Sequence, residues 1–200
     1  NVVNEINGRS ICIATGGRPR KIDGMPNSNS LWFYKDALQV DKIPERLLVV
    51  GSGAIGVEFA SFFAQMGSVV SLLESKPNIL PNEDLDISNF AEKQFLTRGI
   101  KIYKNFSLLS LKERGNFFEA ELKSEDKKLV LSFDKVISAV GIVGNIENLN
   151  LEGININFSN GSIIVDEYCR TSVSNIYAIG DVASPPWLAH KASHEGILVA

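Results

Sequence analysis

The sequence predicts an α/β fold in which a Rossmann-like parallel sheet is interrupted by an antiparallel meander. Three observations predict it. The apolar run 47–50 passes directly into a glycine-rich turn and an amphipathic stretch, and the apolar run 69–73 follows. Between residues 118 and 133 the hydrophobic period changes from about 3.6 to about 2. The order strand, helix, strand is typical of a βαβ unit with parallel strands.

The N-terminal part contains one short apolar run, residues 10–14, which leads into Thr15-Gly16-Gly17. We expect a buried strand there that ends in a tight turn. The segment 22–30 concentrates Gly, Pro, Asn and Ser, which are typical of connections. We therefore place a domain boundary after residue 30.

The βαβ unit occupies residues 47–74. The strand 47–50 is followed by the turn Gly51-Ser52-Gly53-Ala54-Ile55-Gly56 and by a helix that Gly67 is expected to cap. The apolar positions of this helix have helical spacing and predict one buried face, formed by Ile55, Phe59, Phe62, Phe63 and Met66. The strand 69–73 comes next and leads into Glu74.

The later elements follow from the same two periods. We expect a helix over 87–96 that ends at Gly99, alternating strands over 118–122 and 129–133, a buried strand over 136–140, strands over 162–165 and 176–179, and a last helix from about Trp187. The chain is thus predicted to divide into segments 1–30, 31–145 and 146–200.

The composition excludes several classes of protein. A formal net charge of −3 gives no support to a basic nucleic-acid face. No apolar run approaches the ~18 residues that a membrane span needs. Cys12 and Cys169 stand far apart in the sequence without metal-ligand spacing, so we expect a reducing compartment and no disulfide or thiol chemistry.

The glycine-rich turn predicts a dinucleotide site. Gly51 allows the tight turn, Gly53 lets the backbone approach a pyrophosphate, and Gly56 lets the helix pack closely. The free amides at the start of the helix can then receive the phosphates. The alternative is a purely structural strand-turn-helix corner.

Two acidic residues near this turn carry hypotheses of their own. Glu74, 18 positions past Gly56, can accept hydrogen bonds from an adenosine ribose and would repel a 2′-phosphate, which favours NAD over NADP. Lys76 could soften that preference, and Glu74 could instead be a solvated acid at a strand end. Glu58, expected in the first turn of the helix, either complements the helix dipole or positions a nicotinamide ring.

Asp181 follows the strand 176–179 and is expected at the carboxyl edge of a sheet, where it could bind sugar-like hydroxyls or cap the next turn. His190, His194 and Glu195 have a spacing that suggests zinc. We reject that interpretation, because the order His-x-x-x-His-Glu differs from H-E-x-x-H and the sequence indicates no third ligand. No metal site is expected.

Four segments together carry a resemblance to a known family. They are Ile13 to Pro19, Val50 to Phe59, Thr171 to Asp181 and Leu188 to Ala192. In these segments the chain resembles the pyridine nucleotide-disulfide oxidoreductases, flavoproteins with two dinucleotide-binding folds. Within that family it is most similar to the dihydrolipoamide dehydrogenases.

The resemblance implies two cofactors. It assigns 31–145 as the NAD-binding domain, 1–30 as the end of the first FAD-binding segment with a linker, and 146–200 as the return to the FAD-binding and central domains. The implied NAD contacts are Gly51, Ser52, Gly53, Ala54, Ile55, Gly56, Val57, Glu58, Glu74, Leu108 and Gly141. The implied FAD contacts are Thr15, Gly16, Gly17, Asp181, Trp187, Leu188, Ala189 and His190.

The resemblance also implies a reaction and partners. Such enzymes oxidise protein-bound dihydrolipoamide through a disulfide and FAD and pass hydride to NAD. Such enzymes form homodimers, and their other partner is the lipoyl domain of a 2-oxo acid dehydrogenase complex. The bacterial cytoplasm and the mitochondrial matrix both fit.

Parts of the family pattern are missing from this chain. The N-terminal redox disulfide and the C-terminal dimerisation domain with its His and Glu are absent, so we expect a fragment that is inactive alone and holds no catalytic residue. The family commonly reads Gly-Arg-x-Pro-Asn where this chain has Gly141-Ile142-Val143-Gly144-Asn145. The alternatives are a glutathione or mercuric reductase-like flavoprotein and a non-catalytic nucleotide-binding module.

Overall fold

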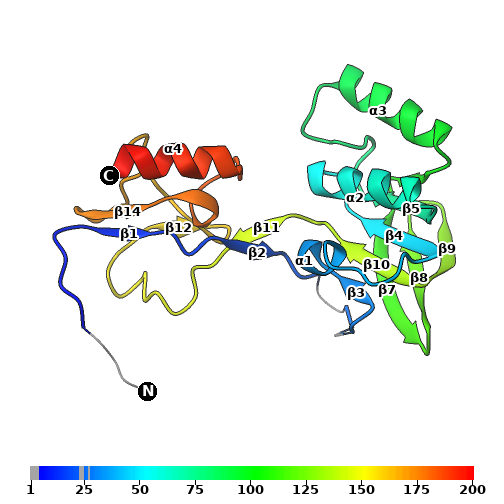
Figure 1. Cartoon of the computed structure of the whole chain (residues 1–200), viewed down its shortest axis with the longest axis horizontal. Helices are drawn as coiled ribbons and strands as arrows, with labels where there is room; N and C mark the ends of the chain where they lie inside the picture. Colours follow the sequence, from blue (N-terminus) through cyan, green and yellow to red (C-terminus); the bar gives the residue numbers. More distant parts are fainter. Residues whose placement is uncertain (1–4, 23–24, 27) are drawn as a thin grey trace. The chain divides into compact units, whose positions relative to one another are not determined.

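The computed structural model describes residues 5–22, 25–26 and 28–200, and the chain forms two compact units (Figure 1). The larger unit is Pro19–Gly141, and the smaller one combines Asn1–Arg18 with Ile142–Ala200. The sequence places the boundaries after residues 30 and 145 instead. The first difference arises because Ile22 and Met25 pack against the core of the larger unit. Residues 1–4, 23, 24 and 27 of the predicted segment 1–30 lie outside the described residues.

The larger unit is built on a parallel sheet of five strands in the order β3-β10-β4-β5-β6. These strands are β3 (Leu31–Trp32), β4 (Arg46–Val50), β5 (Val69–Glu74), β6 (Lys101–Lys104) and β10 (Lys135–Ser138). Its helices are α1 (Tyr34–Ala37), α2 (Ala54–Gln65) and α3 (Leu85–Thr97). The path β4, α2, β5, α3, β6 lays successive strands side by side, which confirms the predicted α/β fold with parallel βαβ units.

The predicted antiparallel insertion is present as a meander of three strands. They are β7 (Ser107–Arg114), β8 (Phe117–Lys123) and β9 (Lys128–Phe133). Phe118, Ala120 and Leu122 are fully buried, as the alternation predicts. The sequence did not reveal β7, because a register shift between Leu108 and Ser110 breaks its alternation.

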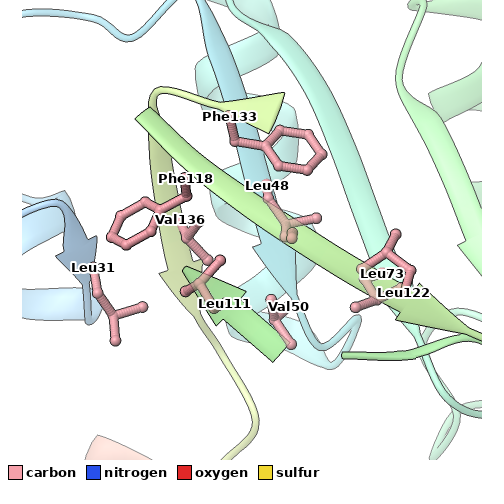
Figure 2. Packing of buried hydrophobic residues seen from close by; sticks show 10 residues of the cluster. Leu31, Leu48, Val50, Leu73, Leu111, Phe118, Leu122, Phe133 and Val136 are labelled. Atoms are coloured by element: carbon pink, nitrogen blue, oxygen red, sulfur yellow. The ribbon is translucent and has the colours of Figure 1, made fainter. Parts of the chain in front are cut away.

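Two apolar cores hold the larger unit together. One joins the meander to the sheet (Figure 2), and its buried members are Leu31, Leu48, Val50, Leu73, Leu111, Phe118, Ala120, Leu122, Phe133 and Val136. The other contains Phe63, Leu47, Val49, Val70 and Leu72, with residues of α2 packed on β4 and β5. Alternate residues of each strand thus point to opposite faces, so β4 and β5 are covered on both sides.

The buried face of α2 differs from the prediction. Gly56, Ala60 and Phe63 are its buried residues, while Phe62 and Met66 are 48% and 53% exposed. The small residues face the sheet because the start of the helix lies close to the preceding turn: a Cβ on Gly56 would collide with the Gly51 carbonyl oxygen. The expected end is confirmed, since Gly67 has a φ of +97° just past the helix.

The smaller unit consists of short paired strands and one long helix. The pairs are β1 (Ile11–Ile13) with β14 (Ile176–Ala178), β2 (Gly17–Pro19) with β11 (Ile142–Gly144), and β12 (Phe158–Ser159) with β13 (Ser162–Ile163). The 3₁₀ turn η1 (Gly180–Val182) follows β14, and α4 (Ala189–Val199) comes last. The expectation of a buried strand over 10–14 is wrong, because β1 has a single strand partner among the described residues and leaves Ile11 and Cys12 exposed.

Candidate nucleotide-binding sites

The glycine-rich turn connects β4 to α2 at the carboxyl edge of the sheet. Gly51 has a φ of +98°, and a Cβ there would lie 2.5 Å from the Ala139 carbonyl oxygen, so only glycine fits. The Gly51 amide donates to the Leu73 carbonyl oxygen at 2.9 Å, which ties the turn to β5. Apart from Gly53 itself and its two chain neighbours, no heavy atom of the described residues lies within 4 Å of a Cβ position at Gly53. The backbone at Gly53 is therefore open to a ligand.

The start of α2 is suited to an anion. Gly53 is the N-cap and has no side chain with which to cap the helix, and the first turn contains no acidic residue. The first-turn amides, which include those of Ala54 and Ile55, therefore lack an acceptor from a capping side chain. Glu58 lies beyond this first turn and is exposed, so the idea that it complements the dipole from the first turn is wrong.

Glu74, the last residue of β5, is only 7% exposed, and its carboxylate is hydrogen-bonded at both oxygens. The amide and hydroxyl of Ser52 donate to Oε2 at 3.0 and 2.6 Å. The Lys76 amide and the Ser75 hydroxyl donate to Oε1 at 2.9 and 3.3 Å. The alternative of a solvated acid at a strand end is therefore wrong. Glu74 lies against the glycine-rich turn.

These hydrogen bonds set the charge state of Glu74. Burial is the largest single influence and raises the pKa of this carboxyl, but the bonds from Ser52, Lys76 and Ser75 act together in the other direction. The net result is a pKa below the ordinary value of 4.5. Glu74 is therefore a carboxylate at neutral pH, as recognition of a ribose hydroxyl requires.

Leu108 and Gly141 flank the same edge. The Phe106 amide donates to the Glu74 carbonyl oxygen at 3.0 Å. The strand β7, which contains Leu108, therefore begins close to the end of β5. Gly141, with a φ of +99°, lies shortly after β10, whose Ser138 pairs in register with Val50. No sequence motif selects Ser138, yet its buried hydroxyl has no hydrogen-bond partner in the described part of the chain.

In the smaller unit, the predicted FAD residues fall into two groups. Gly16 turns the chain with a φ of +71°, and a Cβ on Gly17 would lie 3.1 Å from the Cβ of Asp181. The Thr15–Gly17 turn and Asp181 are thus neighbours. Asp181 lies inside η1, whose N-cap is Ile179, so it does not cap the turn that follows β14.

The second group lies where α4 begins. The Trp187 Nε1 donates to the Ala183 carbonyl oxygen at 3.2 Å and fixes the indole on the segment after η1. Leu188, Ala189 and His190 are exposed, and Leu188 supplies no side-chain cap to the helix. This arrangement leaves the start of α4 open to a ligand.

Comparison with known proteins decides the family. The pyridine nucleotide-disulphide oxidoreductase family matches residues 1–196. The chain belongs to this family. Dihydrolipoyl dehydrogenase of Rhizobium etli is 45% identical over 192 residues, which are 95% of this chain and 40% of that enzyme. The corresponding enzyme of Zymomonas mobilis is 43% identical and is matched over 96% of this chain and 42% of its own length.

Solved structures support the same assignment. LpdA of Mycobacterium tuberculosis aligns with a TM-score of 0.86 and 28% identity, over 94% of this chain and 41% of that one. The HOCl-induced flavoprotein disulfide reductase RclA of Escherichia coli, solved as a Cu(II) complex, aligns with a TM-score of 0.84 and 28% identity, over 97% of this chain and 45% of that one. The chain thus spans about 40% of the length of the curated relatives it matches.

The segment that departs from the usual family pattern is held by polar bonds. The Asn145 Nδ2 donates to the Thr15 carbonyl oxygen at 2.9 Å, and the Thr15 hydroxyl donates back to the Asn145 carbonyl oxygen at 2.7 Å. Arg18 donates to the Gly144 carbonyl oxygen at 3.0 Å and forms an ion pair with Glu147. Sequence reasoning missed Arg18 and Glu147, because residues more than 120 positions apart give no local signal.

The sequence singles out Glu195 only through the rejected zinc spacing, and the structure shows it in another role. Its Oε2 accepts from the Gly180 amide at 2.8 Å, and its Oε1 pairs with Lys191 at 2.5 Å. The i,i+4 spacing of Lys191 and Glu195 was the available signal. Glu195 thus ties α4 to the turn that carries Asp181.

The described residues offer neither a metal centre nor a membrane span. No group of three or more His, Cys, Asp or Glu side chains among them could hold a metal ion. Within the same residues, no helix is long and apolar enough to cross a bilayer.

Proposed function

We propose that this chain is the NAD-binding part of a dihydrolipoamide dehydrogenase, with flanking segments that contact FAD. One observation carries the proposal: the open backbone at Gly53 and the ionised Glu74 meet at the carboxyl edge of a five-stranded parallel sheet. Ligands of open α/β sheets bind at this edge. The high identity to dihydrolipoyl dehydrogenases supports the choice within the family.

The larger unit would hold NAD through complementary charge. The pyrophosphate would lie at the first-turn amides of α2, and the adenosine ribose would bond to Glu74. A 2′-phosphate would meet the Glu74 carboxylate at a cost on the order of 4 kcal/mol per charge pair, for ~4 Å and an effective dielectric of about 20. NAD is therefore preferred over NADP. Leu108 and Gly141 would line the rest of the site.

The smaller unit would hold part of FAD. The Thr15–Gly17 turn would lie along the flavin cofactor, Asp181 would bind its ribityl hydroxyls, and residues 187–190 would pass beside the flavin ring. FAD, when bound, supplies the two-electron chemistry between a dithiol and NAD. The contribution of this chain is to position the two cofactors, which is a matter of orientation and proximity.

The proposal extends to partners and location. The intact enzyme is proposed to be a homodimer that accepts electrons from the lipoyl domain of a 2-oxo acid dehydrogenase complex. The bacterial relatives favour the cytoplasm of a bacterium over the mitochondrial matrix.

Binding of NADH and NADPH to the purified chain, measured by isothermal titration calorimetry, tests the proposal. We expect weak but saturable NADH binding, at least about 10-fold tighter than NADPH, because of the charge on Glu74. Glu74→Ala should weaken NADH and bring the ratio toward one. Glu125→Ala, which removes an exposed carboxylate of the β8–β9 turn, is the matched control and should leave the ratio unchanged.

Two results would count against the proposal. Tighter binding of NADPH than of NADH would favour a glutathione reductase-like enzyme. Formation of NADH from NAD and dihydrolipoamide by the purified chain would contradict the proposal that it is only the nucleotide-binding part.

A further inference from the structure

The carboxylate of Glu74 already makes as many hydrogen bonds as it can accept. An ionised carboxylate offers about four lone-pair positions. Four donors occupy them: the amide and hydroxyl of Ser52, the amide of Lys76 and the hydroxyl of Ser75. An arriving ribose hydroxyl must therefore displace one of these donors.

The two Ser52 bonds at Oε2 are not available for displacement. Ser52 is completely buried, and its hydroxyl lies 2.6 Å from Oε2, within the range of strong charge-assisted bonds. Ser52 lies between Gly51 and Gly53, so these bonds connect the carboxylate to the middle of the glycine-rich turn. Breaking them would leave a buried hydroxyl and a buried amide unsatisfied.

The bonds at Oε1 are unequal. The Lys76 amide donates at 2.9 Å, whereas the Ser75 hydroxyl is 3.3 Å away, which is long for an O–H···O bond. Ser75 is exposed, so its hydroxyl can turn to water when it leaves the carboxylate. It is the donor that a ribose hydroxyl can replace at least cost.

We propose that the two oxygens of Glu74 have separate tasks: Oε2 fixes the glycine-rich turn through Ser52, and Oε1 accepts the ribose hydroxyl in exchange for that of Ser75. This inference rests on the proposed NAD-binding function and deepens it. Ser52 is a positioning residue for the pyrophosphate, and Ser75 modulates ribose recognition. A single carboxylate thus couples the two halves of the nucleotide site.

Two probes separate these tasks. ADP carries both the pyrophosphate and the ribose hydroxyls, whereas 2′,3′-dideoxy-ADP keeps the pyrophosphate, the adenine and the sugar ring but lacks both hydroxyls. We expect Ser52→Ala to weaken both ligands by a similar factor, roughly 5- to 10-fold, since a charge-assisted bond that holds the turn is lost. We expect Ser75→Ala to tighten ADP by about 2-fold and to leave 2′,3′-dideoxy-ADP unchanged, since only a weak competing donor is removed.

The matched control is Ser68→Ala. Ser68 is a buried serine of the same unit, and its hydroxyl donates to the Pro44 carbonyl oxygen at 2.6 Å, before β5 begins. Its removal should leave the affinities for both probes unchanged. Equal effects of Ser75→Ala on both probes, or an unchanged affinity in Ser52→Ala, would overturn the inference.

A measurement without ligand separates this inference from the proposed function. The pKa of the Glu74 carboxyl, followed by carbon-13 NMR, should rise clearly in Ser52→Ala and only slightly in Ser75→Ala. A general loss of structure would move other carboxyls too, so Asp134 serves as the internal reference. If the purified chain binds no ADP but the pKa responds as expected, the nucleotide-binding proposal fails while the Ser52–Glu74 link stands. An unchanged pKa in Ser52→Ala would refute the link itself.

Discussion

Both units place a carboxylate beside a glycine turn, but different interactions stabilise that arrangement in each. In each, a glycine turn lies beside a carboxylate close to the end of a parallel strand: Glu74 in the larger unit and Asp181 in the smaller one. The larger unit supports its turn from beneath with a five-stranded sheet and two apolar cores. Among its described residues, the smaller unit has one core with five buried residues, and α4 contributes none of them.

Polar bonds replace apolar burial in the smaller unit. Arg18, Asn145 and Glu195 hold the Thr15–Gly17 turn and the turn that carries Asp181. Partly exposed ion pairs such as Arg18 with Glu147 contribute little and are screened by salt. Burial of apolar surface is not directional and is not screened by salt as an exposed ion pair is. The difference therefore predicts a rigid glycine turn in the larger unit and a more easily opened one in the smaller unit.

The largest effect should come from truncating the core of the larger unit. Phe63 is completely buried between α2 and the sheet, so Phe63→Ala should destabilise this unit by about 3–5 kcal/mol. Hydrogen exchange should report the loss in the amides of β4 and β5. The amides of β14, in the smaller unit, should keep their protection, because the two units have separate cores.

Phe62 provides the control for that experiment. It is the adjacent residue of α2 and has the same side chain, but it is 48% exposed. Phe62→Ala should cost less than about 1.5 kcal/mol, since its ring is half-exposed and makes an edge-to-face pair with Phe63. Equal losses from the two substitutions, or a loss of protection in β14 caused by Phe63→Ala, would break the distinction between the units.

The sequence predicted most reliably where one face of an element is buried. In β8, Phe118, Ala120 and Leu122 alternate with charged residues, and the alternation alone identified the strand. Alternation does not identify β7, because the register shift after Leu108 interrupts the period. Apolar composition is misleading for β1: it suggests a buried strand, but the described residues leave most of this strand exposed.

Apolar size identifies only part of the buried face of α2. Phe63 is buried as predicted, whereas Phe62 and Met66 are large but exposed, and the other buried positions are the small residues Gly56 and Ala60. Close packing of a helix on a glycine turn demands small residues, and a hydrophobicity pattern does not register that demand. The turn and Glu74 were found from the spacing of the motif, but the saturation of Glu74 by Ser52 and Ser75 depends on side-chain geometry.

Lowering the pH should remove the stabilisation that the ionised Glu74 gives to the larger unit. The pKa of Glu74 is lower in the folded chain than its ordinary value of 4.5, so the unfolded chain takes up this proton first as the pH falls. The stabilisation is complete above about pH 5 and is lost as the pH falls through the folded pKa. Glu74→Gln should therefore cost about 1–2 kcal/mol at pH 7 and progressively less at pH 4 and 3.

The smaller unit supplies the comparison for this pH dependence. Arg18 also lowers the pKa of Glu147, but that carboxylate is 56% exposed. Urea unfolding at each pH should show a smaller difference between wild type and Glu147→Gln, and 0.5 M salt should abolish it. A difference for Glu74→Gln that stays constant from pH 7 to pH 3 would contradict the assignment of its stabilisation to the ionised carboxylate.

The smallest effect should come from Ser138, where the otherwise well-satisfied larger unit leaves a buried hydroxyl without a partner in the described residues. Burying such a hydroxyl removes its hydrogen bonds to water, and no protein hydrogen bond compensates for the loss. Ser138→Ala should therefore leave the free energy of unfolding within about 0.5 kcal/mol of wild type or raise it. Ser68→Ala removes an equally small group but leaves the Pro44 carbonyl oxygen without its donor, and should cost about 1 kcal/mol or more. Urea unfolding of the two variants compares them directly. A loss in Ser138→Ala as large as that in Ser68→Ala would mean that the Ser138 hydroxyl is bonded in solution, and every buried polar side chain described in the larger unit would then have a hydrogen-bond partner.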